Sequence, residues 1–173
     1  MYRLAAPEVA PESQIFSGAL SITVDIPEGA TLRYTMDGST PSMENGRTST
    51  TGKLSTSGTR VYRFALFQDG CLSSPVVTRS YIKRDKSFNI PVVSVVTDPD
   101  HLYDPTIGFL TKGTNGRRGK GTSEYCNWNH DWDRPVNFEM LDPQTGKSLI
   151  NMEADMSRCG GHSKGFTPFS FKI

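Results

Sequence analysis

A glycine-rich stretch near the C-terminus has residue types that could bind phosphate. Residues 160–165 read GGHSKG. The backbone N–H groups of such a loop can surround phosphate oxygens, so the stretch is a candidate nucleotide-binding site. A glycine-rich hairpin turn is the alternative interpretation of the same residues. The residues assigned to the candidate site are Gly160, Gly161, Ser163 and Lys164.

An aromatic cluster in the second half of the chain could bind sugars. Trp128 and Trp132, together with Tyr125, could form a platform on which sugar rings stack. Aromatic side chains near the start of a strand also commonly pack into a hydrophobic core, and this alternative stays open. Trp128 and Trp132 are the candidate glycan-binding residues.

Two pairs of Cys and His residues have spacings that zinc sites allow. They are Cys126 with His130, and Cys159 with His162. The pairs lie far apart in the sequence, so we predict no zinc site.

Three other kinds of site are not supported by the residue pattern. A group of aspartates lacks the glycine pattern of a calcium-binding loop, and the prolines beside it favour helix capping and turns. These aspartates are Asp98, Asp100 and Asp104. The basic stretch 113–124 fails the P-loop pattern, because the Gly-Lys pair is followed by Gly121, and it is predicted to be a mobile loop. No arrangement of Ser, His and Asp or of Cys and His suggests a nucleophile, so we predict no catalytic residue.

Alternating apolar residues predict strands throughout the first half of the chain. The strands are expected within residues 20–26, 32–36, 53–57, 62–66 and 76–82, after an extended edge segment at residues 4–12. Asp37-Gly38 and Asp69-Gly70 are strong turn pairs, since glycine tolerates positive φ. The Asp37 carboxylate is expected to accept backbone N–H groups of residues 39 and 40. Short strands at close spacing predict a β-sandwich over residues 1–82.

The second half is also expected to be rich in strands. A charged linker at residues 83–89 leads into the β-branched run 90–97, which predicts a strand buried on both faces. Residues 97–100 carry a helix-start signal, a capping side chain with a proline beside it. Further strands are expected within residues 109–112, 135–140, 150–157 and 170–173, with a hairpin turn at residues 142–146.

Composition limits the possible partners and the location. The chain has 173 residues and a net charge of +1, which gives no basic footprint for nucleic acid. No run of about eighteen apolar residues occurs, so no membrane span is predicted. Residues 1–12 lack the apolar core of a signal peptide, and we expect that a signal was removed from an exported protein. Cys71, Cys126 and Cys159 allow either a single disulfide or free thiols.

Three blocks of the first half resemble the chitobiase/β-hexosaminidase C-terminal type of domain. They are YTMDGSTPS at 34–42, RVYRFALFQDGCLSS at 60–74 and VVTRSY at 76–81. The resemblance covers about residues 5–82. It implies an immunoglobulin- or fibronectin-III-like sandwich that serves as a non-catalytic appendage of secreted bacterial proteins.

The second half resembles the opening part of the CotH kinase family. The blocks that carry the resemblance are IPVVSVVTDPDHLYDPTIGF at 90–109, NWNHDWDRPVNFEM at 127–140, and ADMSRCGGHSKGF with SFKI between 154 and 173. It implies that residues 90–173 are the N-terminal portion of a divergent protein-kinase-like domain. ATP and Mg²⁺ are implied only for a complete domain, because the metal-binding and catalytic acids belong to its later part. Phe169 stands where many members carry a lysine, the residue that would be the natural phosphate contact.

These patterns lead to two expectations for function. The first is a non-catalytic fragment of a secreted or cell-surface CotH-type protein, whose complete form would be an atypical protein kinase. The second is an adhesion module that binds glycans or proteins, with a degenerate kinase-like part. An exposed apolar strand at residues 170–173 would also favour self-association.

Overall fold

The computed structural model describes residues 2–119, 124–165, 167 and 169–173. The chain divides into two compact units. The first unit comprises Met1–Val96 and Phe138–Met152, and the second comprises Thr97–Asn137 and Glu153–Ile173. Within the part of the chain that the structure describes, no helix is long and apolar enough to cross a membrane.

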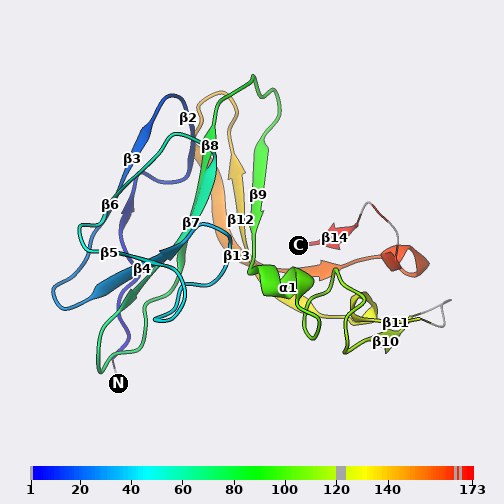
Figure 1. Cartoon of the computed structure of the whole chain (residues 1–173). Coiled ribbons are helices and arrows are strands. Elements are labelled where there is room, and N and C mark those ends of the chain that lie inside the picture. Colours follow the sequence, from blue (N-terminus) through cyan, green and yellow to red (C-terminus); the bar gives the residue numbers. More distant parts are fainter. Residues whose placement is uncertain (1, 120–123, 166, 168) are drawn as a thin grey trace. The chain divides into compact units, whose positions relative to one another are not determined.

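Strands β1 to β8 of the first unit form sheets I and II (Figure 1). Sheet I has the strand order β2-β8-β7-β4-β5, and sheet II has the order β1-β3-β6. Neighbouring strands are antiparallel, except that β2 and β8 are parallel. The strand bounds are β1 Val9–Ala10, β2 Gln14–Phe16, β3 Leu20–Val24, β4 Thr31–Thr35, β5 Arg47–Ser49, β6 Lys53–Thr56, β7 Arg60–Phe67 and β8 Val77–Lys83. The strands predicted for the first half are confirmed.

Both sheets contribute to one hydrophobic core, as expected for a β-sandwich. Leu32 lies opposite Leu66 and Tyr34 opposite Phe64 in the pairing of β4 with β7, so these side chains share the inner face of sheet I. Sheet II contributes Ile22 to the same cluster. The buried residues of the cluster are Leu4, Val9, Phe16, Ile22, Val24, Leu32, Tyr34, Tyr62, Phe64, Leu66 and Tyr81. The fold class is therefore mainly β, with an arrangement consistent with a sandwich.

The turn that follows β4 is organised by Asp37. Its carboxylate accepts the backbone N–H of Ser39 at 3.0 Å and the hydroxyl of Ser39 at 2.6 Å. Gly38 has φ of 87°, which explains the need for glycine. Arg63 of β7 donates to the carbonyl oxygen of Gly38 at 2.8 Å, which anchors the turn to sheet I. Asp37 is therefore a turn residue, and its hydrogen bond to residue 39 was correctly predicted.

Replacing Asp37 with alanine is expected to lower the free energy of unfolding of the first unit by about 1 kcal/mol, because the hydrogen bonds to Ser39 are lost. Chemical denaturation followed by far-UV circular dichroism measures the change. The hydrogen bonds from Ser39 lower the pKa of Asp37 below its ordinary value of 3.8. The stabilisation is therefore present above that value and is lost as the pH falls through the folded-state pKa. A Glu44→Ala control, which removes an exposed carboxylate from the same loop, should leave stability unchanged.

The hairpin of β12 (Asp133–Leu141) and β13 (Ser148–Arg158) lies within the second half of the chain. Its tip, Phe138–Met152, belongs to the first compact unit. The N–H of Ile15 donates to the carbonyl oxygen of Gly146 at 2.8 Å, and Arg84 donates to that of Pro143 at 2.8 Å. These contacts hold the predicted turn at residues 142–146 against β2.

Strand β9 (Val92–Val96) differs from its prediction. It is the edge strand of the sheet β14-β13-β12-β9 (Figure 1). The Ser94 hydroxyl lies 2.9 Å from that of Ser80, so one face of β9 points towards β8. On the other face Val93 is 52% exposed and Val95 40% exposed. The prediction that this strand is buried on both faces was wrong, since an apolar run does not reveal which of its faces will be covered.

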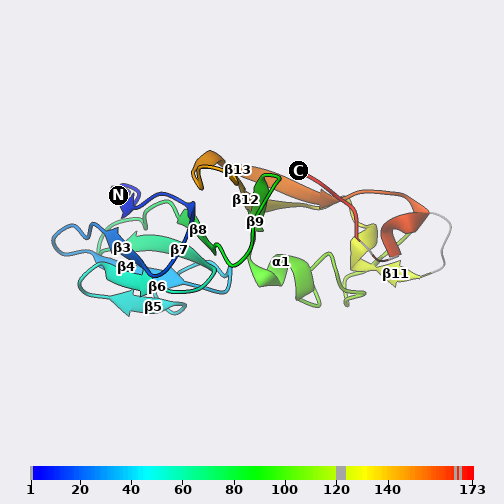
Figure 2. The ribbon, with the colours of Figure 1, turned by 90° about the horizontal axis from the view of Figure 1, so that it is seen from above.

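The second unit contains short helices and strands (Figure 2), and its buried side chains form a small core. Helix α1 (Pro99–Tyr103) begins after Asp98, whose carboxylate accepts the N–H of Asp100, as the helix-start signal predicted. A strand predicted at residues 109–112 is absent from this described stretch, which forms turns around the buried Phe109. The other elements are β10 (Arg117–Arg118), β11 (Tyr125–Cys126), the 3₁₀ helices η1 (Asn127–Asn129) and η2 (His162–Gly165), and β14 (Phe171–Lys172). The core is formed by Phe109, Val136 and Met156, with Leu102, Leu110, Trp132 and Ala154 packed against it.

Candidate functional site

A pocket in the second unit brings basic side chains together with the glycine-rich stretch. Its volume is about 230 Å³. The pocket, called the basic pocket below, is lined by Arg117, Arg118, Gly119, Asn129, Asp131, Gly160, Gly161 and Lys164. Gly160, Gly161 and Lys164 were predicted from the sequence, whereas Ser163 does not line the pocket. The two arginines and the lysine outnumber the one acidic residue, so the pocket is suited to an anion.

The arginines are presented by the short hairpin of β10 and β11. Arg117 pairs with Cys126 and Arg118 with Tyr125. Asn129 donates to the carbonyl oxygen of Arg117 at 2.8 Å, which fixes β10 beside η1. Both arginine side chains are exposed, so they are free to approach a ligand from solution. Residues 120–123 of the predicted basic loop lie outside the described residues.

Lys164 forms the more enclosed wall of the basic pocket. Its side chain is 13% exposed, and its Nζ lies 3.3 Å from Oδ1 of Asp131, which is 86% exposed. The ammonium group is thereby held in place while its partner faces solvent. An anion that approaches Lys164 would compete with an exposed carboxylate, whose ion pair contributes little to stability.

The glycine-rich stretch forms the 3₁₀ helix η2, which lies in the connection between the antiparallel strands β13 and β14. The N–H of Lys164 donates to the carbonyl oxygen of Gly161 at 3.2 Å. Gly160 has φ of 104°, and a Cβ there would lie 2.5 Å from Oγ of Ser163, so only glycine fits. The Lys164 amide is therefore bonded inside the helix, whereas its side-chain ammonium group lines the pocket.

Phe169 packs on Arg158 within the second unit. Its ring lies 4.4 Å from Cζ of Arg158, a cation–π contact. Arg158 is 5% exposed and also donates to the carbonyl oxygen of Lys164. The aromatic residue in the position expected for a lysine therefore packs on an arginine that supports η2.

The candidate glycan-binding tryptophans occupy different settings. Trp132 packs against the core of the second unit. The His130 ring stacks on it at 4.1 Å, and Cζ of Arg134 lies 4.6 Å from its ring centroid. A sugar would have to displace one of these groups to stack on Trp132. Trp128 lies in η1 and is half-buried.

The cysteines and metal-binding residue types do not converge among the described residues. Cys71, Cys126 and Cys159 are free thiols. Burial raises the pKa of the Cys126 thiol. Within residues 2–119, 124–165, 167 and 169–173, no group of three or more His, Cys, Asp or Glu side chains could hold a metal ion. The side chain of His162 lies outside the described part of the chain.

Two fully buried polar side chains were missed by the sequence analysis. Asn127 in the second unit donates to the carbonyl oxygens of Pro105 at 2.9 Å and Gly108 at 3.1 Å. Glu139 in the first unit accepts hydrogen bonds from Ser13 and Asn151. The sequence block 127–140 contains both residues, but its family resemblance does not identify buried hydrogen-bonding side chains.

The comparison with protein families bears on the first unit. Residues 11–78 match the family model described as the chitobiase/beta-hexosaminidase C-terminal domain. This confirms the resemblance found in the first half of the sequence. The match covers less than half of the 173 residues. No curated protein matches the chain.

Proposed function

We propose that this chain is a non-catalytic binding segment of a secreted or cell-surface protein. In this proposal the first unit is an accessory sandwich of the immunoglobulin or fibronectin-III kind. Residues 90–173 are the opening part of a CotH kinase-type domain, and the basic pocket holds the phosphate groups of a nucleotide. The observation that carries the proposal is the meeting of Arg117, Arg118 and Lys164 beside Gly160 and Gly161.

The side chains of the basic pocket fit a polyphosphate better than they fit a metal ion. Guanidinium groups donate paired hydrogen bonds to phosphate oxygens, and a lysine adds a point charge. Asp131 is the one carboxylate that lines the pocket. A Mg²⁺ ion would therefore arrive bound to the nucleotide, and the chain's own residues would bind and orient the phosphates. Catalysis is assigned to none of the described residues.

Isothermal titration calorimetry tests this proposal by measuring the affinity of the chain for ATP in the presence of Mg²⁺ and for tripolyphosphate. The double variant Arg117→Gln, Arg118→Gln is expected to bind at least about tenfold more weakly, since a hydrogen bond to a charged group contributes about 1.5–3 kcal/mol. The control is Arg47→Gln, Arg60→Gln, which removes the same charge from exposed positions of the first unit. Equal loss of affinity in both variants would show a general charge effect, and an absence of ATP binding would refute the proposal.

A second candidate is a module that binds glycans or proteins. The match of residues 11–78 to a domain named after chitobiase and β-hexosaminidase supports it, because those names denote sugar-cleaving enzymes. Self-association through β14 belongs to the same proposal, since β14 is the edge strand of its sheet. In this view the basic pocket has no nucleotide partner.

A further inference from the structure

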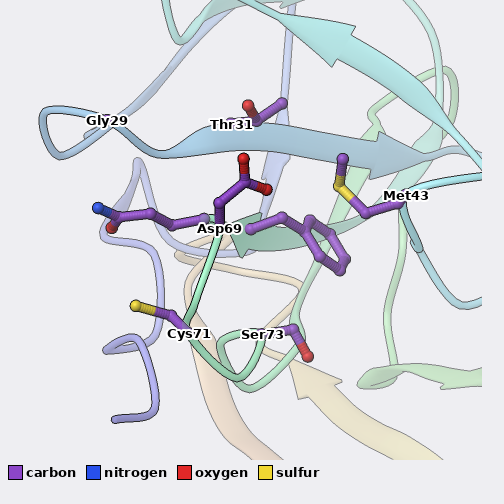
Figure 3. A pocket seen from close by; sticks show the side chains of 8 residues that line it. Gly29, Thr31, Met43, Asp69, Cys71 and Ser73 are labelled. Carbon is purple, nitrogen blue, oxygen red and sulfur yellow. The ribbon is translucent and has the colours of Figure 1, made fainter. Parts of the chain in front are cut away.

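A second pocket lies in the first unit, on the sandwich itself (Figure 3). Its volume is about 390 Å³, within the range of small-molecule sites. It is called the sandwich pocket below and is lined by Gly29, Thr31, Met43, Phe67, Gln68, Asp69, Cys71 and Ser73. Neither the sequence motifs nor the family match assigns a role to it.

The pocket lies on the outer face of sheet I. Thr31 and Phe67 are opposite each other in the pairing of β4 with β7, so their side chains share a face. The adjacent Leu32 and Leu66 point into the core, so Thr31 and Phe67 point away from it. The half-buried Phe67 therefore offers an aromatic surface at the end of the strand, outside the core.

Two loops complete the walls of the sandwich pocket. In Figure 3, Met43 approaches from the loop after β4, and the Asp69 carboxylate points towards the strand that carries Thr31. The turn after β7 is closed by the N–H of Cys71, which donates to the carbonyl oxygen of Gln68 at 3.1 Å. Gly29 leaves room for the Gln68 side chain, because a Cβ at Gly29 would lie 3.1 Å from its amide nitrogen.

The side chains that line the sandwich pocket indicate which class of ligand it would bind. Phe67 and Met43 are apolar, whereas Gln68 and Asp69 offer an amide and a carboxylate. The hydroxyl groups of Thr31 and Ser73 add donors and acceptors. The pocket contains a carboxylate and no cationic side chain, which disfavours phosphate and other anions. A ring with one apolar face and several hydroxyl groups would satisfy both kinds of lining.

We propose that the sandwich pocket binds a neutral sugar, one or two pyranose rings in length. The apolar face of the sugar would pack against Phe67 and Met43, and its hydroxyl groups would bond to Asp69 and Gln68. The proposal rests on the second candidate function, glycan binding by this chain. It assigns that binding to the sandwich, whereas the sequence pointed to Trp128 and Trp132.

Titration of the ¹⁵N-labelled chain with cellobiose, maltose and N,N′-diacetylchitobiose, each to about 10 mM, tests the site by NMR, because affinities of this kind fall near the millimolar range. Amide shifts are expected at Thr31, Met43 and Ser73 for at least one sugar. Asp69→Ala should weaken binding at least about tenfold, by loss of charge-assisted hydrogen bonds. Glu8→Ala, which removes an exposed carboxylate elsewhere on the same unit, is the matched control and should bind as the unmodified chain does.

Cysteine labelling gives an independent measurement on the unmodified chain. A bound sugar is expected to slow alkylation of Cys71 by iodoacetamide, while Cys159, a half-buried thiol of the second unit, reacts at an unchanged rate. Shifts confined to Trp128 and Trp132 would keep glycan binding as the function and overturn the sandwich pocket as its site. An absence of shifts with all three sugars, or unchanged binding by Asp69→Ala, would also overturn it.

Discussion

Replacing Asn127 with alanine is expected to lower the free energy of unfolding of the second unit by about 3 kcal/mol. The side chain is fully buried, and its amide donates to the carbonyl oxygens of Pro105 and Gly108. Loss of the amide leaves two acceptors without their donor, and each such group costs about 1–3 kcal/mol. Since these carbonyls belong to the segment after α1, that segment should loosen first.

The two tryptophans of the chain make this effect measurable in one unit alone. Trp128 and Trp132 both belong to the second unit, so tryptophan fluorescence during urea denaturation reports on that unit. The matched control is Asn129→Ala in the same 3₁₀ helix. Asn129 is half-buried, and its amide donates to the carbonyl oxygens of Arg117 at 2.8 Å and Glu124 at 3.4 Å. Both bonds are exposed, so water can replace them and the loss should cost less than about 1 kcal/mol. Equal destabilisation by both variants would contradict the role given to Asn127.

The first unit could be predicted well from the sequence because its pattern is local. Each strand alternates apolar and polar residues, and turn pairs such as Asp37-Gly38 and Asp69-Gly70 separate the strands. Burial on one face then follows from the period of two along a strand. The packing of residues 138–152 against this unit could not be predicted in the same way. The sequence of the β12–β13 hairpin does not indicate which other strands its tip will contact.

The basic pocket could be predicted only in part. Gly160, Gly161 and Lys164 stand in one short stretch whose composition suggested phosphate binding. Arg117 and Arg118 come from a different part of the sequence and reach the pocket through the pairing of β10 with β11. The residues of this basic loop do not indicate that it will lie beside the glycine-rich stretch, which is distant in sequence. The position of the two arginines in the basic pocket is therefore known only from the tertiary structure.

The sequence does not determine the surroundings of apolar and aromatic residues that pack against distant strands. The run of β-branched residues in β9 predicted burial on both faces, but the structure covers only the face that carries Ser94. Trp132 was a candidate for sugar stacking, with core packing as the alternative, and in the structure it packs against the core of the second unit. The hydrophobicity of a residue predicts that it tends to be buried. It does not predict which other residues will cover it, because these depend on the tertiary fold.

The first unit is expected to lose stability as the pH rises above the ordinary pKa of a glutamic acid, because of Glu139. Its carboxyl is 0% exposed, and burial raises its pKa above the ordinary value of 4.5. Between the unfolded and the folded pKa, the folded unit therefore holds a proton that the unfolded chain has lost. The free energy of unfolding falls with pH through this window, and below it the stabilisation is fully present. Asp37 acts in the opposite direction and at lower pH, so the two effects are separable.

Two variants of Glu139 separate its charge from its hydrogen bonds. The hydroxyl of Ser13 accepts the N–H of Ser80 at 2.9 Å and donates to Glu139, and Asn151 donates to the same carboxyl oxygen. Glu139→Gln keeps an acceptor and the volume but cannot ionise, so it should match the unmodified chain near pH 4 and exceed its stability near pH 8. Glu139→Ala removes the acceptor from both donors and leaves a cavity, with an expected loss of about 3 kcal/mol at either pH.

Far-UV circular dichroism and hydrogen exchange of the sheet I amides follow the first unit across this pH range. The decisive quantity is the slope of the free energy of unfolding against pH, compared between the unmodified chain and Glu139→Gln. If both slopes are the same, the buried carboxyl does not set the pH dependence. If Glu139→Gln is flatter and Glu139→Ala is uniformly less stable, the carboxyl that links β12 to Ser13 and Asn151 is held as a neutral acid. In that case hydrogen bonds to the neutral carboxyl of Glu139 hold the hairpin tip against the sandwich, whereas the same carboxyl would be ionised at neutral pH if it were exposed to water.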